Sequence, residues 1–61
     1  MPKIEMSSGD LRVDRRLAFA EGLWAGGDAV VAADLMAETM PEAPHWAVGW
    51  LRFGEMAEAA G

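Results

Sequence analysis

Hydrophobic side chains recur every three or four residues along three stretches of the chain, which is the spacing of one side of an α-helix. The first stretch begins after Asp10, a good N-cap residue, and ends at Gly26-Gly27, where glycine reaches the left-handed C-cap conformation without steric cost. Its periodic apolar residues are Leu11, Leu17, Ala20, Leu23 and Trp24, with Phe19 nearby. The pattern predicts a helix over about residues 10–26.

A second apolar stretch follows Asp28, which we expect to cap a helix over about residues 28–41. Pro41 should stop or bend this helix, because proline lacks the amide N–H and disfavours helical geometry in the residue before it. The predicted buried face consists of Ala29, Val31, Ala32, Leu35, Met36, Thr39 and Met40. A third helix is expected over about residues 46–60, and its predicted inward stripe is Trp50, Phe53, Gly54 and Ala57.

The turns between these helices are short, so sequential helices should lie antiparallel. Residues 1–9 contain proline, serine and glycine without periodicity and are predicted to be a flexible N-terminal tail. No stretch has a convincing strand pattern. We therefore expect an all-α fold of three antiparallel helices over residues 10–61.

The first and third helical stretches are related by a 34-residue shift. Residues 13–27 placed on residues 47–61 give five identities in fifteen positions. The identical pairs are Leu17 and Leu51, Phe19 and Phe53, Glu21 and Glu55, Ala25 and Ala59, and Gly27 and Gly61. A period of about 34 residues is typical of a helix–turn–helix repeat.

With this period, the chain resembles the tetratricopeptide repeat (TPR) family. Matching positions in the first repeat are Phe19, Ala20, Leu23, Ala32, Met36 and Pro44. Those in the second repeat are Trp50, Phe53, Gly54 and Ala57. Departures from the family pattern are Arg16, Thr39, Pro41 and Glu42. The resemblance implies about one and a half TPR-like repeats and a role in protein–protein contact.

A narrower resemblance is to the N-terminal helical segment of bacterial TPR-containing SAM-dependent methyltransferases. The segments DRRLAFAEGLWAGGD and APHWAVGWLRFGEMAEAAG carry it. The chain has no strand leading into a glycine-rich turn, which is the sequence feature of a Rossmann-like cofactor site. The resemblance therefore implies an accessory segment, and we expect no cofactor and no catalytic activity from these residues.

Composition narrows the classes of partner. Ten acidic residues against five basic ones give a net charge of −5, which disfavours binding to nucleic acid. No stretch approaches the roughly 20 apolar residues that cross a bilayer, and the N-terminus lacks the pattern of a signal peptide. The chain has no cysteine, which suits a reducing compartment. We predict a cytoplasmic protein that binds neither nucleic acid nor membrane.

Candidate catalytic and metal-binding residues are few. His45 is the only histidine, so the sequence predicts no metal site. The carboxylates of Glu55 and Glu58, and those of Glu38 and Glu42, are expected to be solvated on helix surfaces. Arg12, Arg15 and Arg16 form the one basic cluster, a possible docking patch for an acidic partner or a phosphate unless nearby acids neutralise it.

The aromatic residues carry the functional prediction. Three helices offer little interior for three tryptophans, so at least one should be exposed, either Trp46 or Trp50. The predicted interaction surface consists of Trp46, Trp50, Phe53 and Ala57. Its partner would be parent-chain sequence, a second copy or another protein's helix. We predict a protein-interaction or self-association module, with a homo-oligomer if the chain stands alone. The alternatives are the methyltransferase accessory segment and a stand-alone acidic helical regulator.

Overall fold

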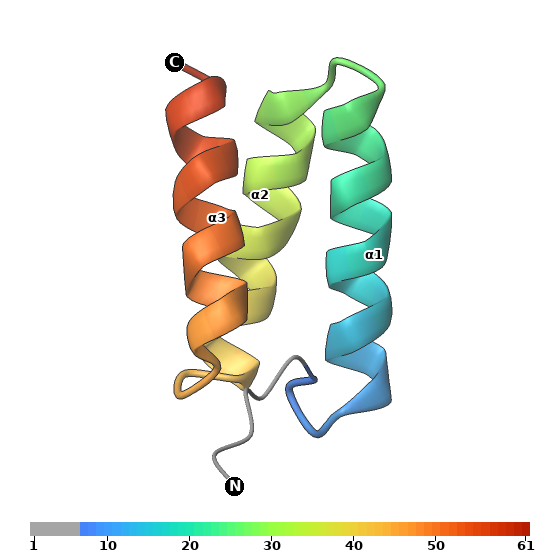
Figure 1. Cartoon of the computed structure of the whole chain (residues 1–61), viewed down its shortest axis with the longest axis vertical. Coiled ribbons are helices and arrows are strands. Elements are labelled where there is room, and N and C mark those ends of the chain that lie inside the picture. The colour runs from blue at the N-terminus through green and yellow to red at the C-terminus, as the bar shows by residue number, and fades with distance from the viewer. Residues whose placement is uncertain (1–6) are drawn as a thin grey trace, which may run out of the picture.

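The computed structural model describes residues 7–61, and these residues form three α-helices (Figure 1). Helix α1 spans Leu11–Ala25, α2 spans Ala29–Thr39 and α3 spans Ala47–Ala59. A short 3-10 turn, η1, covers Met40–Glu42. Neighbouring helices run antiparallel, and the described part of the chain contains no strand. The predicted all-α, three-helix fold is confirmed. The predicted tail, residues 1–9, lies mostly outside the described residues.

Local signals set the helix ends. The Asp10 carboxylate accepts a hydrogen bond from the Arg12 N–H at 2.9 Å, as expected of an N-cap. Gly27 has a φ of 93°, a conformation that favours glycine, and it turns the chain into α2. Pro41 lies in η1, directly after α2 ends. The capping prediction for Asp28 is wrong in one respect, because its side chain makes no capping hydrogen bond.

The core lies around α2, which packs against α1 on one side and α3 on the other. Nine apolar side chains form its buried centre: Val13, Leu17, Ala20, Ala32, Ala33, Met36, Met40, Trp46 and Met56. Thr39 is also buried, and its hydroxyl donates to the Leu35 carbonyl at 2.7 Å. Small residues let the helices approach, and flexible methionines fill the remaining space.

Gly49 lets the Trp46 indole pack onto the first turn of α3. A Cβ on Gly49 would lie 2.9 Å from the Met40 sulfur and closer still to the Trp46 ring. Glycine is therefore required at this position for steric reasons. This contact joins the start of α3 to the end of α2.

Val31, predicted to lie on a buried face, is exposed, and so are the apolar residues Leu11 and Phe19 of α1. Leu11 is 62% exposed, Phe19 64% and Val31 46%. Each successive residue turns about 100° around a helix, so Phe19 lies roughly 160° away from Leu17. Because Leu17 faces α2, Phe19 cannot.

The inward stripe predicted for α3 is also wrong. Trp50, Gly54 and Ala57 are exposed, and Phe53 alone of the four packs partly against the core. The buried positions of α3 are Gly49 and Met56. The face of α3 that contacts α2 is therefore turned by about 100° from the predicted one, and Phe53 lies at the edge that the two faces share.

Candidate functional site

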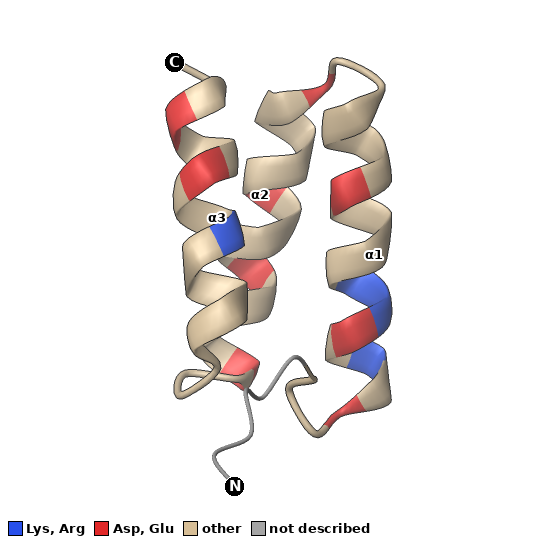
Figure 2. Cartoon of the chain, viewed as in Figure 1, with Lys and Arg blue, Asp and Glu red and all other residues tan. Residues whose placement is uncertain are grey.

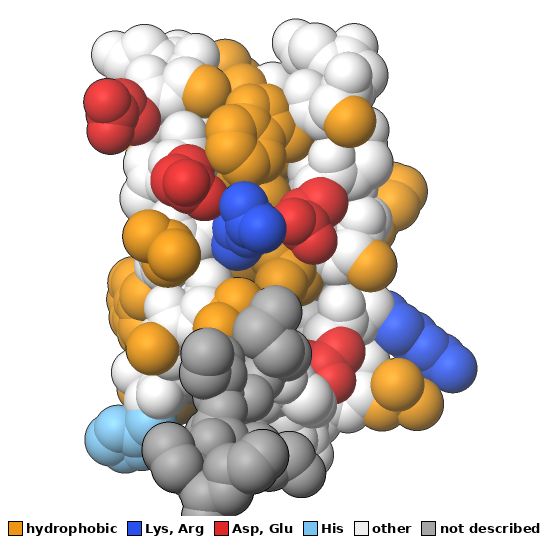
Figure 3. Space-filling view, viewed as in Figure 1, with side chains coloured by type: hydrophobic (Ala, Val, Ile, Leu, Met, Phe, Trp, Pro, Cys, Tyr) orange, Lys and Arg blue, Asp and Glu red, His pale blue; other side chains and the backbone are white. Residues whose placement is uncertain are grey.

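The outward face of α3 is exposed and mostly apolar. We define it by six exposed residues: Ala47, Trp50, Leu51, Gly54, Ala57 and Glu58. Leu51 is 63% exposed and Trp50 44% exposed. Hydrophobic side chains are visible along this outer edge of the molecule (Figure 3). Exposed aromatic and aliphatic residues gathered on one face are typical of an interaction site.

Trp50 is held in place although it is exposed. Its indole N–H donates to the Pro44 carbonyl at 2.8 Å. Its ring also packs against Phe53, with centroids 5.9 Å apart and planes tilted by 50°. The polar atom of the indole is therefore satisfied within the chain, and the rest of the ring is available for contact.

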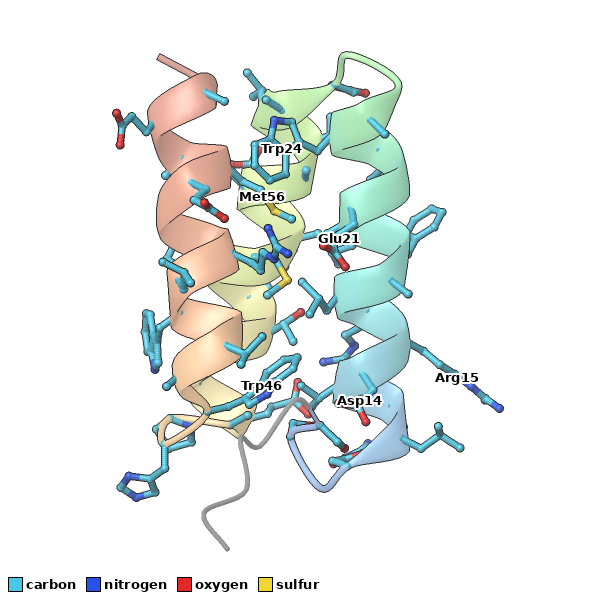
Figure 4. The ribbon with its side chains drawn as sticks, viewed as in Figure 1. Asp14, Arg15, Glu21, Trp24, Trp46 and Met56 are labelled. Carbon is cyan, nitrogen blue, oxygen red and sulfur yellow. The ribbon has the colours of Figure 1, made fainter. Side chains whose placement is uncertain are left out.

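The four residues predicted to form the interaction surface differ in exposure. Trp50 and Ala57 are exposed on the outward face of α3, and Phe53 is half-buried beside them. Trp46 is only 5% exposed, so its assignment to an exposed surface is wrong. The indole of Trp46 projects inward, toward α1, from the start of α3 (Figure 4). Its position over Gly49 explains the burial.

Sequence reasoning missed Leu51, Ala47 and Glu58, although the 34-residue shift carries a signal for Leu51 and Ala47. The equivalents of Ala47, Leu51 and Gly54 in α1 are Val13, Leu17 and Ala20, all of which are buried against α2. Equivalent faces of α1 and α3 thus have opposite exposure.

The reverse relation holds for the other side of each helix. Gly49, Phe53 and Met56 of α3 face the core, whereas their equivalents in α1, Arg15, Phe19 and Gly22, are all exposed. The two related helices pack on α2 from opposite sides, so each uses a different face of the repeated sequence. Consequently α3 leaves open the face that α1 uses to bind α2.

Ion pairs occupy most of the predicted basic patch. Arg12 lies 3.3 Å from Asp10 and 3.7 Å from Glu42, and Arg16 also pairs with Glu42. The hydrogen bond from the Arg12 side chain lowers the pKa of Asp10. Arg15 points away from the helices and pairs with none of the described residues (Figure 4). The patch therefore fastens α1 to η1 instead of forming a single docking surface.

Arg52 connects α3 to α1. Its side chain lies 3.5 Å from Glu21 and 3.2 Å from Glu55. Arg52 is the one basic residue of α3, and the other described basic residues lie on α1 (Figure 2). Glu21 and Glu55 are equivalent in the 34-residue repeat, and both carboxylates pair with the same arginine.

The segment before α1 is fixed by the Asp14 carboxylate. The carboxylate accepts hydrogen bonds from the Ser7 hydroxyl at 2.6 Å, the Ser8 hydroxyl at 2.8 Å and the Ser8 N–H at 2.9 Å. These hydrogen bonds, that of Ser7 first, lower the pKa of Asp14. The bonds extend order to two residues that the sequence places in the flexible tail.

The described residues offer little for catalysis or metal binding. His45 is exposed and lines a shallow hollow between residues 7–9 and residues 42–48, together with Glu42. Within residues 7–61, no group of three His, Cys, Asp or Glu side chains could hold a metal ion. None of the helices in this range has the length and apolar character needed to cross a bilayer.

Comparisons with known proteins leave the site to be interpreted from its own geometry. No protein-family model matches the chain, and no curated protein or solved structure is significantly similar to it.

Proposed function

We propose that this chain is a protein-interaction module that binds an amphipathic helix on the outward face of α3. The observation that carries the proposal is the opposite exposure of equivalent faces in α1 and α3. Leu17 packs on α2, whereas its equivalent Leu51 is 63% exposed. The outward face of α3 therefore has apolar residues at the same spacing as the face of α1 that packs on α2. No helix of the described residues covers it.

The chemistry of this face also supports helix binding. Gly54 and Ala57 have small side chains or none, and the larger side chains of Trp50 and Leu51 project beside them. Packing one helix on another requires such alternation of small and large side chains. The pre-oriented Trp50 ring lowers the entropy that binding would cost.

The proposal includes the TPR-like character and the cytoplasmic location as predictions. Spacing in the sequence supports the first, and the absence of cysteine supports the second. The geometry gives no comparable support to a catalytic role for the described residues.

A peptide of residues 28–42 is the natural probe, because it includes the helix that covers the equivalent face of α1. We expect saturable binding of this labelled peptide to the intact chain, measured by fluorescence anisotropy. Leu51→Glu should weaken the affinity by about ten-fold or more, which corresponds to roughly 1.4 kcal/mol. A charge placed on an apolar contact must be desolvated.

Leu11→Glu is the matched control, since Leu11 is 62% exposed and lies on α1. It should leave peptide affinity unchanged. Equal loss of affinity in the two variants, or no binding by the wild-type chain in this assay and in the self-association assays below, would contradict the proposed function.

A further inference from the structure

The outward face of α3 is self-complementary around Gly54. Leu51 lies three residues before Gly54 and Ala57 three residues after it. Trp50 and Glu58 lie four residues before and after it. If two α3 helices pair antiparallel with their Gly54 residues at the crossing, each Leu51 faces the small Ala57 of the other copy. Each Trp50 then faces the other copy's Glu58. A two-fold interface requires this self-complementarity, because the same patch must fit itself.

We propose that the partner of this face is a second copy of the chain, docked antiparallel through α3 with Gly54 at the crossing point. The inference rests on the proposed function and names its partner. The dimer would continue the helix order as α1, α2, α3, then α3, α2 and α1 of the other copy. Each helix would then be antiparallel to its neighbour, as α1 and α2 already are.

Gly54 allows the close approach that this geometry needs. A Cβ on Gly54 would meet no atom within 4 Å, so the backbone at the crossing is uncovered. With no side chain at the crossing, the two helix axes can come together until the flanking Leu51 and Ala57 side chains touch.

The face carries little charge, so local charge does not prevent a second copy from docking on it. Glu58 is the only ionisable residue of the six, and the neighbouring Glu55 is paired with Arg52. In the antiparallel arrangement the two Glu58 residues are eight positions apart along the axis, or about 12 Å. This exceeds the Debye length of about 8 Å at physiological ionic strength, so their repulsion is screened.

The interface also leaves no new unsatisfied donor. The Trp50 N–H is already bonded to the Pro44 carbonyl, so covering the ring costs no hydrogen bond with water. The described chain exposes 4204 Å², and a standard interface of about 800 Å² per partner would take about one-fifth of it. One helix face is smaller than this, so the dimer should be weak, with a Kd in the micromolar range or above.

Single cysteines test the geometry, because the chain has none of its own. Ala57→Cys places the two thiols of the dimer six positions apart along the axis, or about 9 Å, and leaves Gly54 without a side chain. Ala18→Cys is the matched control, since Ala18 is also an exposed helical alanine and lies on α1. With a short bis-maleimide, Ala57→Cys should form covalent dimers at least about ten-fold faster than Ala18→Cys.

Sedimentation equilibrium of the wild-type chain up to about 1 mM supplies the second measurement, and we expect reversible dimers at these concentrations. Leu51→Glu should raise the dimer Kd about ten-fold or more, whereas Leu11→Glu should not. Circular dichroism will verify that both variants remain helical.

The outcomes separate this inference from the proposed function. A chain that stays monomeric but binds the peptide of residues 28–42 would overturn the inference and leave the function standing. Dimers in which Ala18→Cys cross-links as fast as Ala57→Cys would also overturn it. Failure of both peptide binding and dimerisation would overturn the proposed function as well.

Discussion

Gly49 is the one glycine of the described residues at which an added Cβ would collide with its neighbours. An added Cβ would collide with the Met40 sulfur and the Trp46 ring, and overpacking of this kind costs about 1–3 kcal/mol. Replacing glycine with alanine inside a helix otherwise stabilises by about 1 kcal/mol. We expect Gly49→Ala to lower the midpoint of thermal unfolding and Gly22→Ala, which has open space, to raise it by several degrees. A higher midpoint for both variants would contradict the Trp46 packing.

Asp14 gives the chain a pH-dependent contribution to stability. Its pKa is lowered in the folded state, so its hydrogen bonds with Ser7 and Ser8 stabilise the fold above the unfolded pKa of about 4 and are lost as pH falls through the folded pKa. In Asp14→Asn, the free energy of unfolding should therefore decrease less than in the wild type as the pH falls. Denaturant unfolding between about pH 5 and pH 2 would measure this.

The double variant Ser7→Ala, Ser8→Ala removes the side-chain donors to the same carboxylate. It should therefore show part of the same reduction in the pH dependence of the free energy of unfolding. The Ser8 N–H remains as a donor in that variant. If the free energy of unfolding of Asp14→Asn fell with pH as steeply as that of the wild type, the carboxylate would not stabilise the segment before α1.

At the scale of the helices, Arg52 should contribute a small, salt-sensitive link between α3 and α1. Exposed ion pairs are worth about 0–1 kcal/mol, so Arg52→Gln should lower the free energy of unfolding by less than about 1 kcal/mol. The difference should shrink in high salt. Arg15→Gln is the control, because Arg15 has no ion pair within the described residues. Urea unfolding at low and high salt measures both, and equal effects would contradict the link.

The helices themselves are largely predictable because their ends are decided locally. Asp10 caps α1, Gly27 provides a left-handed turn after it, and Pro41 follows α2 within η1. Each of these signals acts through the backbone of its own segment. The predicted bounds therefore agree with the structure to within one or two residues, once residues 40–42 are recognised as a 3-10 turn.

The facing of the helices is much less predictable. Apolar residues surround α1 and α3 on more than one side, so periodicity alone does not indicate which side meets α2. Either Phe19 or Leu17 could face the core from α1, and in the structure Leu17 does. The burial of Trp46 depends on a glycine three residues later, which periodicity does not reveal. Such choices depend on contacts between elements.

For the whole molecule, charge should control the strength of self-association. Two copies each carry a net charge of −5 and repel one another, whereas the proposed contact is apolar. We expect the dimer to strengthen as salt rises from about 50 to about 500 mM, because the repulsion is screened. Sedimentation at several salt concentrations measures this effect. A dimer that weakens steadily with salt would point to a contact made by ion pairs.

The most direct measurement of the central claim is a map of backbone amide shifts in the labelled chain as its concentration, or that of the peptide of residues 28–42, is raised. We expect the largest changes to cluster on the outward face of α3, at Leu51, Gly54 and Ala57. Changes centred on Leu11, Arg15 and Phe19 of α1, or none on α3, would contradict it.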